Sequence, residues 1–259
     1  MTGTGARGLS FGPAADDYDR LRPQYPPEAL RWALGERGLR VVDLGAGTGI
    51  LTRTVAALGH EVIPVEPDAR MRTRLEQASP QLTALDGRAE QIPLPDGSVD
   101  AVVAGQAYHW FDPEPAHAEI ARVLRPGGVF APVWNVRDES VPWVAELSTI
   151  TDDDTAGRGI EEPTPRVAPL GPAFGPLAER QFHHAVWLTA DSLVGLIATR
   201  SYYLTATPER RRELEQRVRR LCATHPDLAG RDRFPLPYRT LVYRASTLSR
   251  SGSGGGAAR

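Results

Sequence analysis

The sequence predicts an α/β fold built around a mostly parallel β-sheet. Short apolar runs alternate with amphipathic stretches along the first 135 residues, and the first apolar run passes through a glycine-rich turn directly into a helix. The 259 residues suffice for one large α/β domain or two small ones, and a hydrophobic content of 41% suits a packed core.

The elements of the first half follow from these apolar runs and from the turn residues between them. The predicted strands are residues 40–44, 60–65, 81–85, 98–104 and 129–134. The predicted helices are residues 49–58, 68–78 and 113–124. Gly59 fits a left-handed helix end, residues 95–97 form a turn before the fourth strand, and residues 125–128 stop the last helix. Strands separated by helices predict βαβ units.

The pattern changes after about residue 150. Residues 151–176 are rich in Asp, Gly and Pro and are too long for a plain connection. Two more strands are predicted at residues 181–188 and 238–243, with helices at 190–199 and 208–223 between them. Residues 1–10 and 249–259 are small and glycine-rich, which predicts disordered tails.

Composition excludes several classes of function. A net charge of -2 and a pI near 6.3 argue against nucleic-acid binding, which usually needs a basic excess. Cys222 is the only cysteine, so neither an intrachain disulfide nor a cysteine-based zinc site can form, and we expect no metal. No apolar stretch approaches 18 residues. We therefore expect a cytoplasmic protein, a monomer or homodimer, that binds neither membrane nor nucleic acid.

The turn at residues 43–49, Asp-Leu-Gly-Ala-Gly-Thr-Gly, is a predicted ligand-binding turn. Its glycines permit positive φ and close approach of a ligand, and the following helix offers free N–H groups. Dinucleotide sites prefer G-x-G-x-x-G/A, whereas here Ile50 follows G-x-G-x-G. Asp43 would repel a pyrophosphate but suits a ligand with an ammonium group.

Glu66 ends the second predicted strand. A carboxylate at this place can accept hydrogen bonds from both ribose hydroxyls, and it would repel the 2′-phosphate of NADP. The alternative is a solvated residue at the start of a helix.

Four blocks of sequence, in order, resemble the motifs of class I S-adenosylmethionine-dependent methyltransferases. They are residues 41–49, 66–68, 89–100 and 124–128. A closer resemblance, at residues 18–26 and 105–111, is to the branch similar to trans-aconitate methyltransferases, which implies a small-molecule acceptor. Arg88 departs from the pattern, because many relatives carry an acidic residue there to hold the adenine amino group. That role would pass to the Ala89 backbone and to Glu90.

The resemblance implies a Rossmann-like sheet of seven strands in the order 3-2-1-4-5-7-6, with the last strand antiparallel, flanked by helices. It implies one domain over residues 11–248, with a helical lid (11–38), a cofactor-binding core (39–135) and an acceptor-side region with a helical insertion and the last strands (136–248). The implied cofactor is S-adenosyl-L-methionine. Its expected contacts are Tyr18, Tyr25, Asp43, Gly45, Ala46, Gly47, Thr48, Gly49, Glu66, Pro67, Met71, Arg88, Ala89, Glu90 and Gln106.

Candidate catalytic residues are His109 and Tyr18. His109 follows the fourth strand closely, and an imidazole can take a proton near neutral pH, although it could instead orient the substrate or pack against Trp110. The resemblance places Tyr18 and Tyr25 in a lid over the cofactor, where tyrosine suits a sulfonium; plain helix packing is the alternative.

Candidate substrate contacts are Arg22, Trp110, Trp134 and Tyr202. The two tryptophans could wall an apolar pocket or belong to the core. Arg22, Arg137 and Arg200 could each pair with an anionic substrate or be surface charges. The arginine-rich stretch 209–220 could meet an acidic partner, but its interleaved glutamates favour a solvated, salt-bridged helix face.

These observations favour methyl transfer to an O, N or C nucleophile of a small molecule, by direct displacement with release of S-adenosylhomocysteine. Two alternatives remain. The same fold could bind S-adenosylmethionine without transferring its methyl group, as a sensor or a cyclase. An NAD-dependent oxidoreductase is disfavoured by the glycine spacing and by Asp43.

Overall fold

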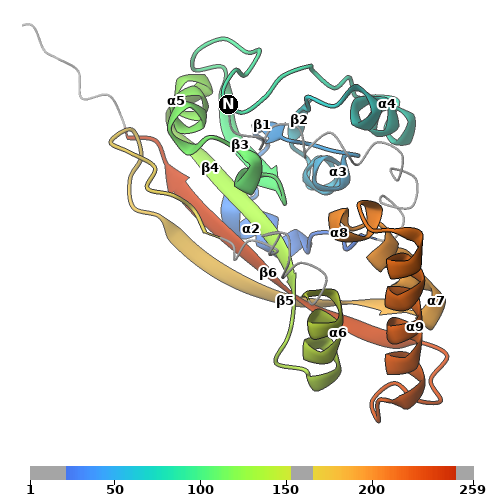
Figure 1. Cartoon of the computed structure of the whole chain (residues 1–259). Helices are drawn as coiled ribbons and strands as arrows, with labels where there is room; N and C mark the ends of the chain where they lie inside the picture. The colour runs from blue at the N-terminus through green and yellow to red at the C-terminus, as the bar shows by residue number, and fades with distance from the viewer. Residues whose placement is uncertain (1–21, 153–165, 249–259) are drawn as a thin grey trace, which may run out of the picture.

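The computed structural model describes residues 22–152 and 166–248. A six-stranded sheet in the order β2-β1-β3-β4-β6-β5 forms its centre (Figure 1). The strands are β1 (Arg40–Leu44), β2 (Glu61–Val65), β3 (Val99–Gly105), β4 (Leu124–Arg137), β5 (Ala178–Leu188) and β6 (Phe234–Ser246). β1 pairs in parallel with β2 and β3, and β3 with β4, whereas β6 runs antiparallel to β4 and β5.

The predicted strand order is confirmed with one strand fewer. Within residues 81–85 only Leu85 joins the sheet, through an isolated parallel bridge to Val65. The next bridge would need a backbone N–H at position 64, and Pro64 has none. The Ala84 N–H instead donates to Glu76 Oε1 at 3.0 Å. The prediction of a third strand at residues 81–85, and with it the prediction of seven strands, is therefore wrong.

The helices are α2 (Pro27–Leu34), α3 (Ile50–Ala57), α4 (Ala69–Ala78), α5 (Pro113–Val123), α6 (Pro142–Asp152), α7 (Ala190–Ala198), α8 (Ser201–Leu204) and α9 (Pro208–Thr224), with a short 3-10 turn η2 (Tyr108–Trp110). α6 is absent from the sequence prediction. The strands β4, β5 and β6 are longer than predicted, and α5 runs directly into β4, so residues 125–128 lie inside this strand rather than before it. None of the described helices combines the length and apolar content of a membrane span.

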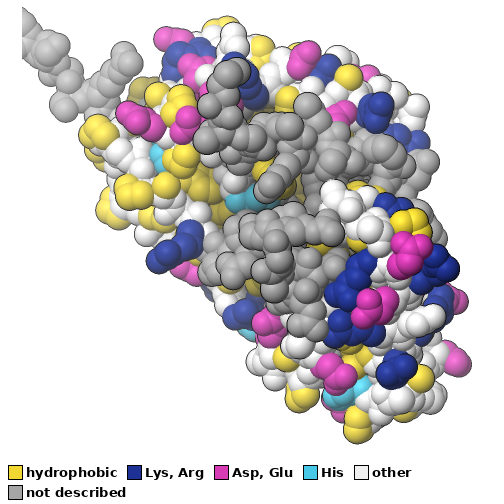
Figure 2. All heavy atoms as spheres, viewed as in Figure 1, with side chains coloured by type: hydrophobic (Ala, Val, Ile, Leu, Met, Phe, Trp, Pro, Cys, Tyr) yellow, Lys and Arg dark blue, Asp and Glu magenta, His cyan; other side chains and the backbone are white. Residues whose placement is uncertain are grey.

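Figure 1 shows α6, α7 and α9 gathered at one end of the long strands β5 and β6. Their apolar faces share a buried cluster with the ends of these strands, built around Leu147, Leu196, Leu214 and Leu236. The outer face of α9 carries interleaved positive and negative side chains (Figure 2). Arg210 pairs with Glu213 at 2.7 Å and Arg219 pairs with Asp191 at 2.6 Å. These contacts support the solvated, salt-bridged face.

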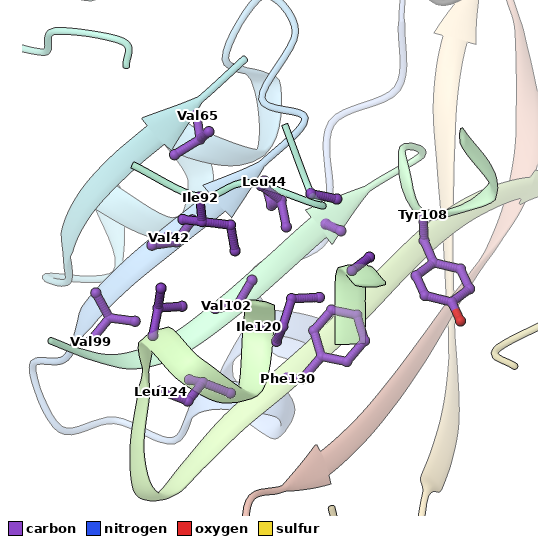
Figure 3. Close-up of a cluster of buried hydrophobic side chains, with 14 of the residues drawn as sticks. Val42, Leu44, Val65, Ile92, Val99, Val102, Tyr108, Ile120, Leu124 and Phe130 are labelled. Carbon is purple, nitrogen blue, oxygen red and sulfur yellow. The ribbon is translucent and has the colours of Figure 1, made fainter. Parts of the chain in front are cut away.

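Two further clusters cover the two faces of the parallel half of the sheet. β3 supplies both, because alternate residues of a strand point to opposite faces and this strand is buried on each. Figure 3 shows Ile120 of α5 against Val102 and Phe130 of the sheet. On the other face, Val103 packs with Leu30 of α2 and other apolar residues of α2 and α3. This packing holds the ends of β1 and β3 beside each other.

Candidate functional site

The glycine-rich turn connects β1 to α3, as predicted. Gly45 and Gly47 both take positive φ (73° and 56°), which a residue with a side chain rarely adopts. A Cβ on Gly45 would lie 2.6 Å from the Ala107 Cβ, whereas a Cβ on Gly47 would meet none of the described residues within 4 Å. Gly45 is therefore needed for packing against the end of β3, and Gly47 leaves open space above the turn.

Asp43, at the end of β1, is completely buried. Its Oδ2 accepts a 2.6 Å hydrogen bond from Thr52 Oγ1, and its Oδ1 has no hydrogen-bond partner. Burial raises the pKa of Asp43 to about 7, with a smaller rise from the charge of Glu66 and an opposing effect of the Thr52 hydrogen bond. An orphaned carboxylate oxygen at this place is suited to a cation, because a cation would offset the lost solvation.

Glu66 follows β2 and is 7% exposed. Its Oε2 accepts from the Gly47 N–H and its Oε1 from the Asp68 N–H, both at 2.9 Å. Burial raises the pKa of Glu66, while these two hydrogen bonds oppose the rise. The carboxylate thus ties the glycine turn to the start of α4, where Asp68 caps the helix. It is not the solvated residue of the alternative interpretation.

The remaining predicted cofactor residues lie in different surroundings. Ala46, Thr48 and Gly49 belong to the same turn, and the Ala46 N–H donates to the Val65 carbonyl at 3.1 Å. Met71 of α4 and Ala89 are buried, whereas Pro67 and Arg88 are exposed. Glu90 Oε1 accepts from the Asp112 N–H at 2.9 Å, so this carboxylate already holds the loop before α5. Tyr18 lies outside the described residues.

Tyr25 lies over the end of β3. A Cβ on Gly105 would be 2.7 Å from the Tyr25 Oη, so only a glycine admits the buried tyrosine here. The next residue, Gln106, has a positive φ of 53°, which is unusual for a residue with a side chain. Its amide exchanges two hydrogen bonds with the Asn135 backbone, at 3.2 Å to the carbonyl and 3.0 Å from the N–H.

A cavity that opens to solvent lies beside these residues. Among the described residues that line it are Tyr25, Ile50, Gln106, Asn135, Arg22 and Arg200. It therefore adjoins the start of α3 and the ends of β3 and β4, where ligands of open α/β sheets bind.

Asn135 is a functional candidate that the sequence prediction did not single out. It is buried, its Nδ2 donates to the Gln24 carbonyl at 3.2 Å, and its Oδ1 accepts from Thr240 Oγ1 at 2.6 Å. It thereby joins the N-terminal segment, β4 and β6 at the cavity. In the sequence, the feature that could have identified Asn135 is its place as a polar residue within an apolar run.

The predicted catalytic and substrate residues do not all line the cavity. His109 and Trp110 are half-buried in η2, with ring centroids 4.8 Å apart, directly after Gln106. Trp134 does not line the cavity, which corrects the prediction. Neighbouring residues of a strand point to opposite faces, so Trp134 lies on the other side of β4 from Asn135. It is buried there, 5.8 Å from the Tyr108 ring.

Tyr202 and Tyr108 are also core residues. Tyr202 is buried in the cluster of α6, α7 and α9, and it is not among the described residues that line the cavity. The Tyr108 hydroxyl lies 2.9 Å from His117 Nε2 and accepts from the Ala168 N–H at 2.9 Å. Tyr108 thus anchors the segment that follows residue 165 to the end of β3.

Comparison with known proteins gives the family. A family model of a methyltransferase domain matches residues 42–131, which include the turn, Glu66 and all of β3. An uncharacterized methyltransferase of Mycobacterium tuberculosis is 45% identical over 240 residues, 92% of this chain and 96% of that protein. This chain belongs to the class I S-adenosylmethionine-dependent methyltransferases.

Another uncharacterized methyltransferase, of Schizosaccharomyces pombe, is 32% identical over 242 residues, 91% of this methyltransferase chain and 96% of that protein. A solved structure described as a type II methyltransferase, from Anaeromyxobacter dehalogenans, has a TM-score of 0.56 at 24% identity. The alignment covers 88% of this chain and 99% of that chain. The structural likeness confirms the Rossmann-like fold.

Proposed function

We propose that this methyltransferase moves a methyl group from S-adenosyl-L-methionine to a small-molecule acceptor by direct displacement, with release of S-adenosylhomocysteine. The observation that carries the proposal is the pair of buried carboxylates, Asp43 and Glu66, on either side of the glycine turn. Bound S-adenosylmethionine supplies a methyl group activated by a sulfonium, so no covalent enzyme intermediate is needed.

The residues present fit this cofactor. The Asp43 Oδ1, which has no partner, would accept from the ammonium of the methionine part. Each Glu66 oxygen accepts one backbone hydrogen bond and has a second lone pair for a ribose hydroxyl. The open space above Gly47 allows a ligand to approach the turn. Two negative groups at this turn would repel a pyrophosphate, which disfavours NAD.

The acceptor would occupy the cavity, where Tyr25, Gln106 and Asn135 would exclude water and orient it. His109 would take a proton from an acceptor that needs one, whereas a carboxylate acceptor would need only orientation. The proposal keeps Tyr18 and Tyr25 as lid residues and Trp110 and Arg22 as substrate contacts. It also keeps a cytoplasmic location and a monomer or homodimer.

The test is calorimetry of the full chain with S-adenosylmethionine, S-adenosylhomocysteine and NAD. We expect micromolar binding of the first two and none of NAD. Glu66→Ala should weaken S-adenosylhomocysteine binding roughly tenfold or more, because it removes two ribose acceptors. Glu61→Ala is the matched control, since Glu61 begins the same strand and is exposed. Tight NAD binding, or equal effects of both variants, would contradict the proposal.

Methyl transfer is then measured as S-adenosylhomocysteine release with carboxylates, phenols and indoles. Release with at least one class is the expected result. Binding without any release across all three would instead favour a protein that binds S-adenosylmethionine as a sensor or cyclase.

A further inference from the structure

Arg137, the last residue of β4, is a buried cation that has no counterion among the described residues. Arg137 is 8% exposed, and its Nη2 donates to Thr151 Oγ1 of α6 at 3.2 Å. Its Nη1 has no hydrogen-bond partner, and none of the described carboxylates forms an ion pair with it. An arginine stays protonated in proteins, so this is a full buried charge held by a single neutral oxygen.

The neighbouring carboxylate does not serve Arg137. Asp138 Oδ1 accepts from Ser140 Oγ at 2.7 Å and lies 3.7 Å from Arg239 Nε, and Oδ2 lies 3.7 Å from His183. Its partners Arg239 and His183 are in register with Val136, on the face of the sheet opposite to Arg137, so Asp138 is directed away from Arg137. Buried charges in proteins are paired or bind ligands, since isolation from water disfavours them. Arg137 is therefore the group in this region that an anion would satisfy.

The position of Arg137 links it to the cavity. Residues two apart on a strand share a face and lie about 7 Å apart, so Arg137 follows Asn135, a lining residue of the cavity, on the same face of β4. Arg137 itself is not among the described residues that line the cavity, and lies one step beyond them along the strand. Two arginines, Arg22 and the buried Arg200, do line the cavity. Arg22 Nη2 donates to the carbonyl of Thr199, the residue before Arg200, at 3.3 Å. No carboxylate belongs to the described lining residues.

We propose that Arg137, with Arg200 and Arg22, forms an oxyanion-binding site that holds an acidic group of the methyl acceptor. The inference rests on the proposed function, because it takes the cavity beside Tyr25 and Gln106 as the acceptor site. A guanidinium binds a carboxylate or a phosphate through two parallel hydrogen bonds, so this site would fix both the position and the direction of the acceptor. An acceptor without an acidic group would leave the buried charge unsatisfied and would be selected against.

The first experiment is calorimetry of the protein loaded with S-adenosylhomocysteine, titrated with succinate and with inorganic phosphate at constant ionic strength. At least one of the two anions should bind the wild type, and neutral succinamide should not. The arm that binds distinguishes a carboxylate from a phosphate site. Arg137→Gln should weaken this binding roughly tenfold or more while S-adenosylhomocysteine affinity stays within about twofold.

Arg239→Gln is the matched control. Arg239 pairs in register with Val136, so it lies on the opposite face of the sheet from Arg137, and it has Asp138 as its counterion. Anion binding should stay within about twofold in this variant. Failure of both anions to bind the wild type, or equal binding by Arg137→Gln, would overturn the inference. Absence of S-adenosylhomocysteine binding would instead count against the proposed function, and the anion titration is repeated without it.

Thermal unfolding separates anion binding from a purely structural role. Without anion, Arg137→Gln should unfold at the same temperature as the wild type or higher, since it removes an uncompensated buried charge. It should also lose the rise in Tm that the anion gives the wild type. Arg137→Lys keeps the charge without the two-pronged geometry and should bind the anion more weakly than the wild type but better than Arg137→Gln. A lower Tm in Arg137→Gln with unchanged anion binding would show a structural role only.

Discussion

At the scale of single residues, Asp43 predicts a pH dependence of stability. Burial raises its pKa from 3.8 to about 7 in the folded chain, so the folded state holds a proton that the unfolded state loses. In the ligand-free protein, the contribution of Asp43 to the free energy of unfolding is therefore fully present below about pH 4. It is lost as the pH rises to about 7. The slope is at most about 1.4 kcal/mol per pH unit.

Urea unfolding of wild type and Asp43→Asn at pH 5, 6 and 8 measures this effect, because asparagine does not titrate. The free energy of unfolding of the variant should decline less than that of the wild type over this range. Burial also raises the pKa of Glu66, and Asp43 is not among the causes of that shift, so the difference between the two proteins reports on Asp43. Parallel curves would show that Asp43 is already ionised below pH 5.

The same carboxyl group predicts a pH dependence of cofactor binding. A proton on Asp43 competes with the ammonium of S-adenosylhomocysteine, so affinity should rise about tenfold from pH 6 to pH 8 for a group with a pKa of about 7. Asp43→Asn should bind more weakly with a flatter profile. Calorimetry at the two pH values tests this, and an equal slope in the variant would assign the pH dependence to another group.

At the scale of elements, the end of β3 is set by contact with the N-terminal segment. In Gly105→Ala the new Cβ would meet the Tyr25 Oη at 2.7 Å and Leu51 Cδ2 at 2.9 Å, so the buried tyrosine must move. We expect a loss of about 1–3 kcal/mol in stability and weaker S-adenosylhomocysteine binding. Gly38→Ala is the control, because its nearest contact would be 3.5 Å. Unchanged Tm and affinity in Gly105→Ala would show that Tyr25 does not need this position.

Local sequence patterns predicted the elements that depend on neighbours along the chain. The turn at residues 43–49 and Glu66 were placed correctly, because a strand, a glycine turn and a helix follow one another there. The missing third strand could have been read from Pro64, whose lack of an N–H stops the next bridge to β2. The alternation of apolar and polar residues does not show that this one backbone N–H is missing.

The rest of the site depends on contacts between distant residues. Asn135 joins Gln24, Gln106 and Thr240, which lie 111, 29 and 105 positions away, and no local pattern contains such pairings. Trp134 was predicted at the cavity, yet it lies in the core because the pleat of β4 turns Asn135 to the cavity instead. One position in a strand decides which of two neighbouring residues faces the cavity.

At the scale of the whole molecule, the three large buried clusters of the described residues are joined by long strands. The two clusters on the parallel half of the sheet share β3 and β4, and β6 runs from them to the cluster of α6, α7 and α9. Val242 belongs to one of the former, whereas Leu236 and Tyr238 of the same strand belong to the latter. A break between the clusters would have to interrupt the hydrogen bonds of β4 to β6 and of β6 to β5.

This continuity predicts that the described residues, 22–152 and 166–248, unfold as one unit. Leu147 of α6 is completely buried in the cluster of α6, α7 and α9, and Leu147→Ala should lower the free energy of unfolding by about 2–5 kcal/mol. The slowest-exchanging amides report the free energy of global unfolding. If the molecule is one unit, Leu147→Ala should lower this free energy by the same amount for amides in β1, β3 and α9. Glu146→Ala, on the exposed side of the same helix, should change neither. Faster exchange confined to α6, α7 and α9 would show that the helical cluster opens by itself while the cofactor-binding half stays folded.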